Sequence, residues 1–330
     1  MESQLQLINM PEDPMRHILE RCDFVSLQCL RKTCHTFRNF IDDTKPLQLI
    51  EDLSVHGNSE EISLTFFGSD NYRTFSHAGA ILLDYNGLED GNTKITWHRK
   101  DGRRERIIEN NNTLDVFSRD FGTFLGCTQQ KWDKITLRCD KEVLKKIQEN
   151  VLSLTSPLKV NALVISSTES KNSVMEILRS PCPETLTHLH IGAAFEHWNI
   201  SEMVKLAQWK KAKELEMRSI IVSADIENYY HFENVEMYFE NVTVDDLCKL
   251  KKIFLTTPSI TKRFELHGIQ IPSEEMVITT FGEPYLINPV SKYWYFKRHD
   301  NYVLCVNSYG DGFYFSVITK DVLPQDALIL

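Results

Sequence analysis

Residues Met10–Ile41 read MPEDPMRHILERCDFVSLQCLRKTCHTFRNFI. Pro11 is followed by the acidic residues Glu12 and Asp13, an order typical of a helix start, where proline and negative charge are both favoured. Apolar residues then recur at intervals of three and four, which is the spacing of an amphipathic helix; they are Met15, Ile18, Leu19, Cys22, Leu27, Leu30, Cys34, Phe37 and Ile41. Because roughly forty residues bury little core by themselves, we expect a small helical module that completes itself against a partner. A helical hairpin packed on the rest of the chain is the alternative.

The order of Met10-Pro11 and the later run LRKTCHTFR at 30–38 resembles the F-box, a helical motif that docks onto the Skp adaptor of cullin–RING ubiquitin ligases. The chain departs from that motif at Met10 and Met15, where leucine is usual, and at Cys22 and Thr33, where aliphatic residues are common. The resemblance implies that the adaptor-facing or supporting apolar surface is formed by Pro11, Met15, Ile18, Leu19, Leu27, Leu30 and Phe37.

The composition of the chain indicates which classes of protein it can belong to. The 330 residues favour one small module and one larger domain, and 42% hydrophobic residues support a sizeable core. A net charge of −9 argues against a general nucleic-acid binder, which would carry a basic face. No apolar run approaches the length of a membrane span, and residues 1–10 lack the pattern of a signal peptide. The eight cysteines are scattered, as is typical of reduced thiols, so we expect a cytoplasmic or nuclear protein.

The C-terminal two-thirds shows a weak internal period. Alternating runs predict strands at 134–139, 162–166, 188–192, 214–218, 235–240 and 263–267, and helical patterns lie between most of them, at 141–154, 170–179, 200–211 and 243–255. Thr243, followed by Asp245 and Asp246, fits a helix N-cap, and Ser201 with Glu202 fits another. A strand–helix unit repeating about every 26 residues is typical of a leucine-rich-repeat-like α/β solenoid. An ordinary α/β domain is the alternative.

Further strands flank this region. Runs at 62–67, 81–85, 94–98 and 104–108, the last two separated by an Asp-Gly turn at 101–102, predict a β-meander, and a helix is predicted at 114–125. Runs at 293–296, 303–306 and 313–318 predict terminal hairpins. We expect these β-hairpin segments to cap the two edges of the solenoid. The expected organisation is a helical module at 1–50, a meander and helix at 51–130, and an α/β repeat domain at 131–330.

The run QWKKAKEL at 208–215, the strand at 235–239 and the helix start VTVDDL at 242–247 resemble the FTH domain, earlier designated a domain of unknown function. This domain accompanies an N-terminal F-box in the expanded nematode F-box A family. The resemblance covers the chain from about Lys131 to the C-terminus. It implies a substrate-recognition subunit of an SCF-type cullin–RING E3 ubiquitin ligase, which binds the Skp adaptor and cullin and holds an unknown target protein. The alternative is a stoichiometric protein-interaction module with a degenerate F-box and no ligase role.

Alternate residues of a strand face opposite ways, so the polar residues of the predicted repeats are expected on one exposed face. Its later strands carry several glutamates against Arg218 and Arg263, which favours a basic partner. A solvated face without a ligand is the alternative. The candidate substrate-binding residues are Arg138, His188, His190, Glu214, Glu216, Glu236, Tyr238, Glu240 and Glu265.

No motif for catalysis, cofactor or metal binding is recognisable. Asp84-x-Asn86 begins like a calcium loop but lacks its later ligands, and Cys182 with His188 and His190 has no second cysteine pair. The basic residues of 99–106 are expected to form a soluble hairpin tip. No phosphate-binding loop or nucleophile motif is present. We therefore expect a non-catalytic subunit without cofactor; a hydrolase would require a pocket that holds a nucleophile beside a base.

Overall fold

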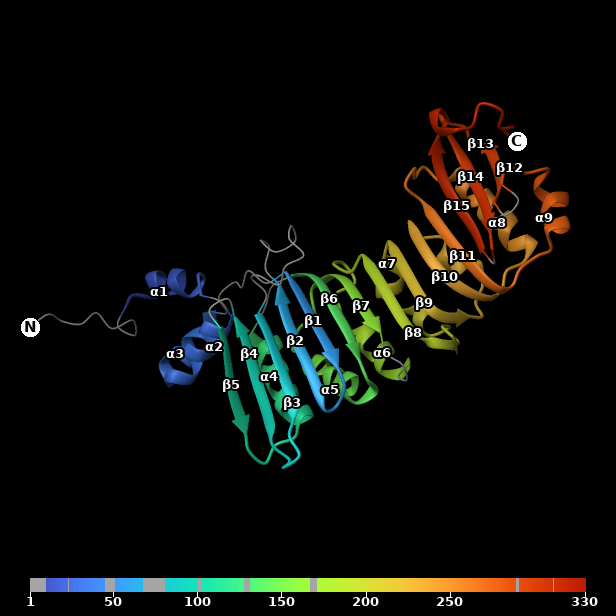
Figure 1. The fold of residues 1–330 in the computed structure, drawn as a ribbon. Helices are drawn as coiled ribbons and strands as arrows, with labels where there is room; N and C mark the ends of the chain where they lie inside the picture. The colour runs from blue at the N-terminus through green and yellow to red at the C-terminus, as the bar shows by residue number, and fades with distance from the viewer. Residues whose placement is uncertain are drawn as a thin grey trace, which may run out of the picture. The chain divides into compact units, whose positions relative to one another are not determined.

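The computed structural model describes residues 10–22, 24–44, 51–67, 81–99, 102–127, 131–166, 171–288, 291–310 and 312–330 (Figure 1). The chain divides into two compact units. The first comprises residues 1–161 and 172–182, and the second comprises residues 162–171 and 183–330. Each unit has a mixed α/β fold, which confirms the predicted fold class at this coarse level.

The first unit begins with three short helices, α1 (Glu12–Leu19), α2 (Phe24–Thr33) and α3 (His35–Thr44). The predicted helix start is confirmed, since Pro11 occupies the N-cap of α1 and both acidic residues lie in its first turn. These three helices form a cluster with an apolar core of their own. The periodic apolar residues of the sequence thus form the core of this helical cluster.

A sheet with strand order β6-β1-β2-β3-β4-β5 completes the first unit. Its strands are β1 (Asp52–Gly57), β2 (Glu61–Phe67), β3 (Ile81–Gly87), β4 (Thr93–Arg99), β5 (Gly102–Ile108) and β6 (Trp132–Cys139). The predicted meander is confirmed as the antiparallel series β2 to β5, although part of its last turn lies outside the described residues. The sequence did not indicate β1, which pairs antiparallel with β2 and parallel with β6.

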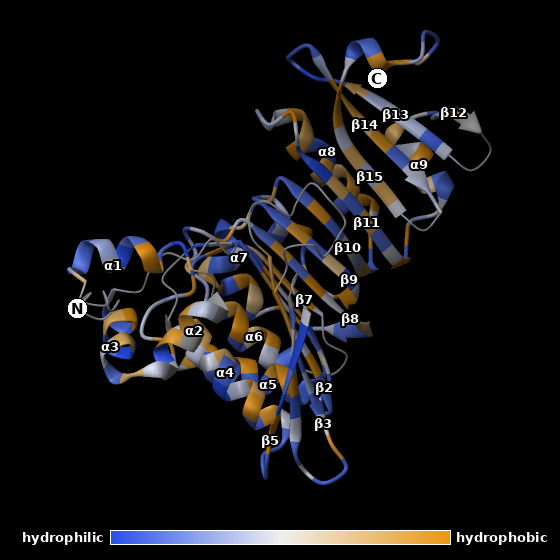
Figure 2. Cartoon of the chain, turned by 60° about the vertical axis from the view of Figure 1, so that its left-hand side comes forward, coloured by the Kyte–Doolittle hydropathy of each residue, from blue (hydrophilic) through white to orange (hydrophobic). Residues whose placement is uncertain are grey.

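Helices cover one side of this sheet: α4 (Thr113–Cys127), α5 (Lys141–Leu152) and α6 (Lys171–Arg179) (Figure 2). The helix predicted at 114–125 is confirmed as α4. Aromatic rings fill the layer between helix and strands, because Phe124 of α4 lies 4.5 Å from Phe66 and 5.4 Å from Trp132, measured between ring centroids. Edge-to-face packing of such rings adds to the energy of apolar burial.

The second unit contains five parallel strands that follow one another in chain order. They are β7 (Val160–Ser166), β8 (His188–Trp198), β9 (Glu214–Val222), β10 (Asn234–Asn241) and β11 (Arg263–Gln270). The antiparallel strand β15 (Gly312–Thr319) pairs with β11, and β14 (Tyr302–Tyr309), β13 (Ser291–Lys297) and β12 (Tyr285–Asn288) follow outward. The predicted strands are all present; β12 was not predicted.

The helices of the second unit include α7 (Ala207–Lys211), α8 (Val244–Thr256) and α9 (Glu274–Phe281). The predicted cap of α8 is confirmed, because the Thr243 hydroxyl accepts the Asp246 N–H and the Asp246 carboxylate accepts the Thr243 N–H. The helix predicted at 200–211 is wrong in its first half. There the chain forms a 3-10 turn, Met203–Lys205, and Leu206 is extended, so only the short α7 remains. The expected cap at Ser201 is absent, since the 3-10 turn starts after Glu202 without a side-chain cap.

Candidate functional site

The N-terminal cluster buries most of the apolar residues that the sequence proposed for adaptor contact. Met15, Leu19, Leu27 and Phe37 expose at most 9% of their surface and pack with Ile41 in one core. These residues therefore support the module from within. Leu30 is partly buried against the same core.

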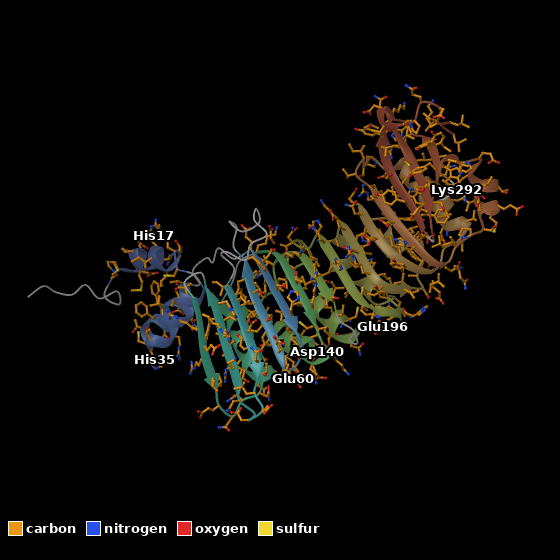
Figure 3. All side chains as sticks on the ribbon, viewed as in Figure 1. His17, His35, Glu60, Asp140, Glu196 and Lys292 are labelled. Atoms are coloured by element: carbon orange, nitrogen blue, oxygen red, sulfur yellow. The ribbon has the colours of Figure 1, made fainter. Side chains whose placement is uncertain are left out.

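An exposed edge of α1 remains available to a partner. Pro11 is exposed, and Ile18 leaves 36% of its surface accessible although its neighbour Leu19 is fully buried. Figure 3 labels His17 on α1 and His35 on α3, both on the outside of the cluster. Of the seven proposed contact residues, Pro11 and Ile18 are the two that the structure places on the surface.

One ion pair ties two helices of the cluster together. The Arg31 guanidinium donates to both oxygens of the Asp42 carboxylate, with distances of 2.7 Å from Nε and 2.9 Å from Nη2. Such bidentate pairing is among the stronger hydrogen-bonded arrangements of side chains. The ion pair fixes α2 against α3 and so holds the C-terminal part of the three-helix cluster in place.

The polar face of the second unit is formed by alternate residues of β8 to β11. In one row across the strands, His190 is in register with Glu216, Glu216 with Glu236, and Glu236 with Glu265. A parallel row runs through His188, Glu214, Asn234 and Arg263. The intervening Leu189, Leu215, Val235 and Phe264 are buried on the opposite side. We call the two rows together the polar face.

The polar face forms a shallow pocket with a volume of about 380 Å³. Its charged and titratable lining residues are His188, His190, Glu214, Glu216, Glu236, Arg263 and Glu265. With the histidines neutral, four carboxylates stand against one guanidinium. Carboxylates in register on adjacent strands repel one another. Other side chains must therefore offset part of this repulsion for the arrangement to persist.

Contacts of the carboxylates with histidine and arginine side chains compensate for that repulsion. His188 Nε2 lies 3.2 Å from Glu214 Oε1, and His190 Nδ1 lies 2.9 Å from Glu216 Oε2. Arg218 contacts Glu216 and lies 3.9 Å from Glu236. The two histidine–glutamate contacts and the approach of Arg218 to Glu236 join neighbouring strands.

Comparison with known protein families identifies both parts of the chain. The F-box domain family matches residues 7–49, and the FTH domain family matches residues 141–282. The chain therefore combines an F-box domain with an FTH domain, as the sequence predicted. It is similar to F-box A protein 224 of Caenorhabditis elegans, with 19% identity over 260 residues, a match that takes in 76% of this chain and 64% of that protein. No solved structure matches.

The FTH match contains the whole polar face and extends from α5 to the end of α9. It is narrower than the coverage expected from the sequence, since β6 and the strands β12 to β15 lie outside it. The F-box match contains α1, α2 and α3.

Six of the nine candidate substrate-binding residues line the pocket of the polar face. Tyr238 and Glu240 lie farther along β10: the Tyr238 ring stacks on His267 with 4.6 Å between centroids, and Glu240 accepts the hydroxyl of Ser223. A register shift between β9 and β10 begins at Tyr238, next to a bulge where Ser219 adopts a φ of 57°. No pattern in the sequence indicated this bulge, and the pocket ends there. Asn234, which also lines the pocket, was not among the candidates.

Arg138 belongs to the first unit, on β6. It is in register with His56 of β1. Burial lowers the pKa of His56, and the positive charge of Arg138 lowers that pKa further. Arg138 thus lies in a different compact unit from the other eight candidates.

The described residues contain no group of three or more histidine, cysteine, aspartate or glutamate side chains placed to hold a metal ion. His188 and His190 of β8 instead face glutamates of the next strand. Among the described residues, no helix has the length and apolar character that crossing a membrane requires.

Proposed function

We propose that the chain is the substrate-recognition subunit of an SCF-type cullin–RING E3 ubiquitin ligase. The F-box binds the Skp adaptor and thereby the cullin, and the FTH domain holds a target protein. In this role the chain breaks no bonds itself and raises the effective concentration of a target lysine near the conjugating enzyme. The site of action is the cytoplasm or the nucleus.

One observation carries the ligase proposal: the F-box has a complete core of its own and still exposes Pro11 and Ile18 on α1. Within an F-box domain, these exposed apolar side chains are available for contact with a partner. Because these two side chains contribute little to the core, they can be replaced without unfolding the module.

The test is co-purification of the full chain with the Skp adaptor and cullin. We expect Pro11→Ala/Ile18→Ala to reduce adaptor capture at least about tenfold, as loss of a central apolar contact does at protein interfaces. His35→Ala changes an exposed residue of α3 (Figure 3) and serves as the matched control, with capture unchanged. If the unaltered chain captures no adaptor, the ligase proposal fails and the stoichiometric interaction module takes its place.

We further propose that β7 to β11 form a leucine-rich-repeat-like array whose polar face binds the target. Supporting this, the five strands are parallel and follow chain order, as they do in solenoids. The proposed functional division remains residues 1–50 for the adaptor, 51–130 as a cap, and 131–330 for the target. A terminal cap at the other end is supported by the pairing of β15 with β11.

The target is proposed to be basic where it meets the pocket, because the pocket carries more carboxylates than cations. A lysine- and arginine-rich peptide is the probe, and its affinity for the full chain is measured by fluorescence anisotropy. We expect Glu216→Lys/Glu236→Lys to weaken binding about tenfold or more. The control Glu60→Lys/Glu61→Lys makes the same change of charge at the turn into β2, far along the chain from the FTH domain. Equal losses in both variants would contradict a specific site.

A further inference from the structure

A second pocket lies within the first unit, on the apolar side of the meander. Its volume is about 540 Å³, within the range of small-molecule sites. Leu83 of β3 together with Ile95 and Trp97 of β4 form its floor, and Phe124 of α4 contributes a wall. In Figures 1 and 2, α2 lies next to α4 on this side of the strands. The pocket therefore opens between the F-box helices and α4.

Arginines from three different elements reach this pocket. Arg38 comes from α3, Arg106 from β5 and Arg119 from α4. Within the described residues none of these three guanidinium groups forms an ion pair, whereas Arg31, which also lines the pocket, is held by Asp42. Among the described residues of the lining, the acidic one is Asp120, and its carboxylate accepts the Tyr85 hydroxyl at 3.4 Å among its contacts.

This concentration of positive charge is opposite in sign to the rest of the protein. The chain carries a net charge of −9, yet an apolar floor is surrounded here by three cations that form no ion pair with any described carboxylate. Neighbouring positive charges repel one another, and at a solvated surface such residues are usually dispersed among acids. A bound anion would remove the repulsion at this position.

We propose that this pocket binds a small organic phosphate, a molecule with a flat apolar or aromatic body and a phosphate group. A guanidinium group donates paired hydrogen bonds whose geometry matches two phosphate oxygens. Three guanidinium groups offer more hydrogen-bond donors than a single carboxylate requires, and this favours a phosphate as the ligand. The indole of Trp97 and the ring of Phe124 provide apolar contact for the body of the ligand. The proposal is independent of adaptor and target binding, since it rests on different residues.

The probe is 1-naphthyl phosphate, titrated into the full chain by isothermal calorimetry, with inorganic phosphate and 1-naphthol as its separate parts. We expect the intact probe to bind at least about tenfold more tightly than either part, because charge and ring are recognised together. Arg106→Gln and Arg119→Gln should each weaken binding about fivefold or more. Both side chains are exposed, so the thermal midpoint without probe should be unchanged.

Arg103→Gln is the matched control. It removes the same charge from the same strand, but Arg103 pairs with His98 in register and so faces away from the side that carries Arg106. Its affinity for the probe should equal that of the unaltered chain. Absence of binding by the unaltered chain, or an equal loss in Arg103→Gln, would overturn the proposal. Tighter binding of a phosphotyrosine peptide than of the small probe would overturn the assignment to a small molecule.

Discussion

Arg298 Nη2 lies 2.9 Å from Asp300 Oδ2, and the arginine side chain is fully buried. The same guanidinium donates to the backbone carbonyl of Phe254, and its Nη2 donates to that of Thr257 at 2.7 Å. These carbonyls belong to the end of α8, where helical carbonyls lack partners within the helix. Arg298 therefore joins α8 of the FTH domain to the turn between β13 and β14.

Replacing Arg298 by methionine should destabilise the second unit by about 3 kcal/mol, because two carbonyls lose their donors in a buried position. Urea unfolding followed by circular dichroism measures the change. Arg179→Met is the control: this arginine pairs with Glu176 on the surface of α6, and its loss should cost under about 0.5 kcal/mol. A similar small effect at Arg298 would show that the carbonyls find other partners.

The same contact predicts an acid-dependent loss of stability. The hydrogen bond from Arg298 lowers the pKa of Asp300 to about 2, below its ordinary value. A carboxyl whose pKa is depressed in the folded state contributes stability above its unfolded pKa and loses it as the pH falls through the folded value. The contribution of Asp300 should therefore disappear between about pH 4 and about pH 2.

Asp300→Asn removes the titrating group, so its urea midpoint should fall less steeply over this interval than that of the unaltered chain. Asp133→Asn, at an exposed aspartate of β6, provides the control for general acid effects. Identical slopes for the unaltered chain and Asp300→Asn would contradict the lowered pKa.

Two buried thiols should resist modification. Burial raises the pKa of Cys139 to about 12 and that of Cys305 to about 11. At pH 8 roughly one Cys139 thiol in ten thousand is then ionised, and the thiolate is the reactive species. Peptide mapping after brief treatment with a disulfide reagent should find both cysteines unlabelled in the folded chain and labelled in guanidinium. Labelling of Cys139 as fast as that of the partly exposed Cys34 would show that β6 opens readily.

Local signals in the sequence were sufficient where the structure depends on local contacts. Thr243 and Asp246 specify the start of α8 through their own side chains, and the alternation along β10 and β11 places Glu236 and Glu265 on one face. The predicted face is thus correct for the part of the FTH domain where the strands stay in register.

Where tertiary contacts decide, the sequence was insufficient. Trp209 is buried and packs on Phe232 with 5.2 Å between ring centroids, and this packing accompanies the shortening of the helix predicted at 200–211 to α7. The bulge at Ser219 places Ile220, Ile221 and Val222 in consecutive buried positions, which a two-residue period does not describe. Such features follow from neighbouring strands, whose positions a single sequence does not show.

In the F-box, the neighbours Ile18 and Leu19 also differ in a way that the helical period of the sequence does not predict. Both fit the helical period, yet Leu19 is fully buried and Ile18 is partly exposed. Leu19→Ala should destabilise the F-box by about 3 kcal/mol, enough to unfold so small a module, and adaptor capture should fail because the module is lost. Ile18→Ala should change stability by less than about 1 kcal/mol and reduce capture through the interface alone.

Hydrogen exchange of α1, α2 and α3 distinguishes these two causes. Protection should disappear in Leu19→Ala and remain in Ile18→Ala, while a pull-down with the Skp adaptor is expected to be weak for both. Full capture by Ile18→Ala with intact protection would place the adaptor contact elsewhere on the F-box. Retained protection in Leu19→Ala would mean that the F-box draws stability from the adjoining meander, because its own core could not tolerate the cavity.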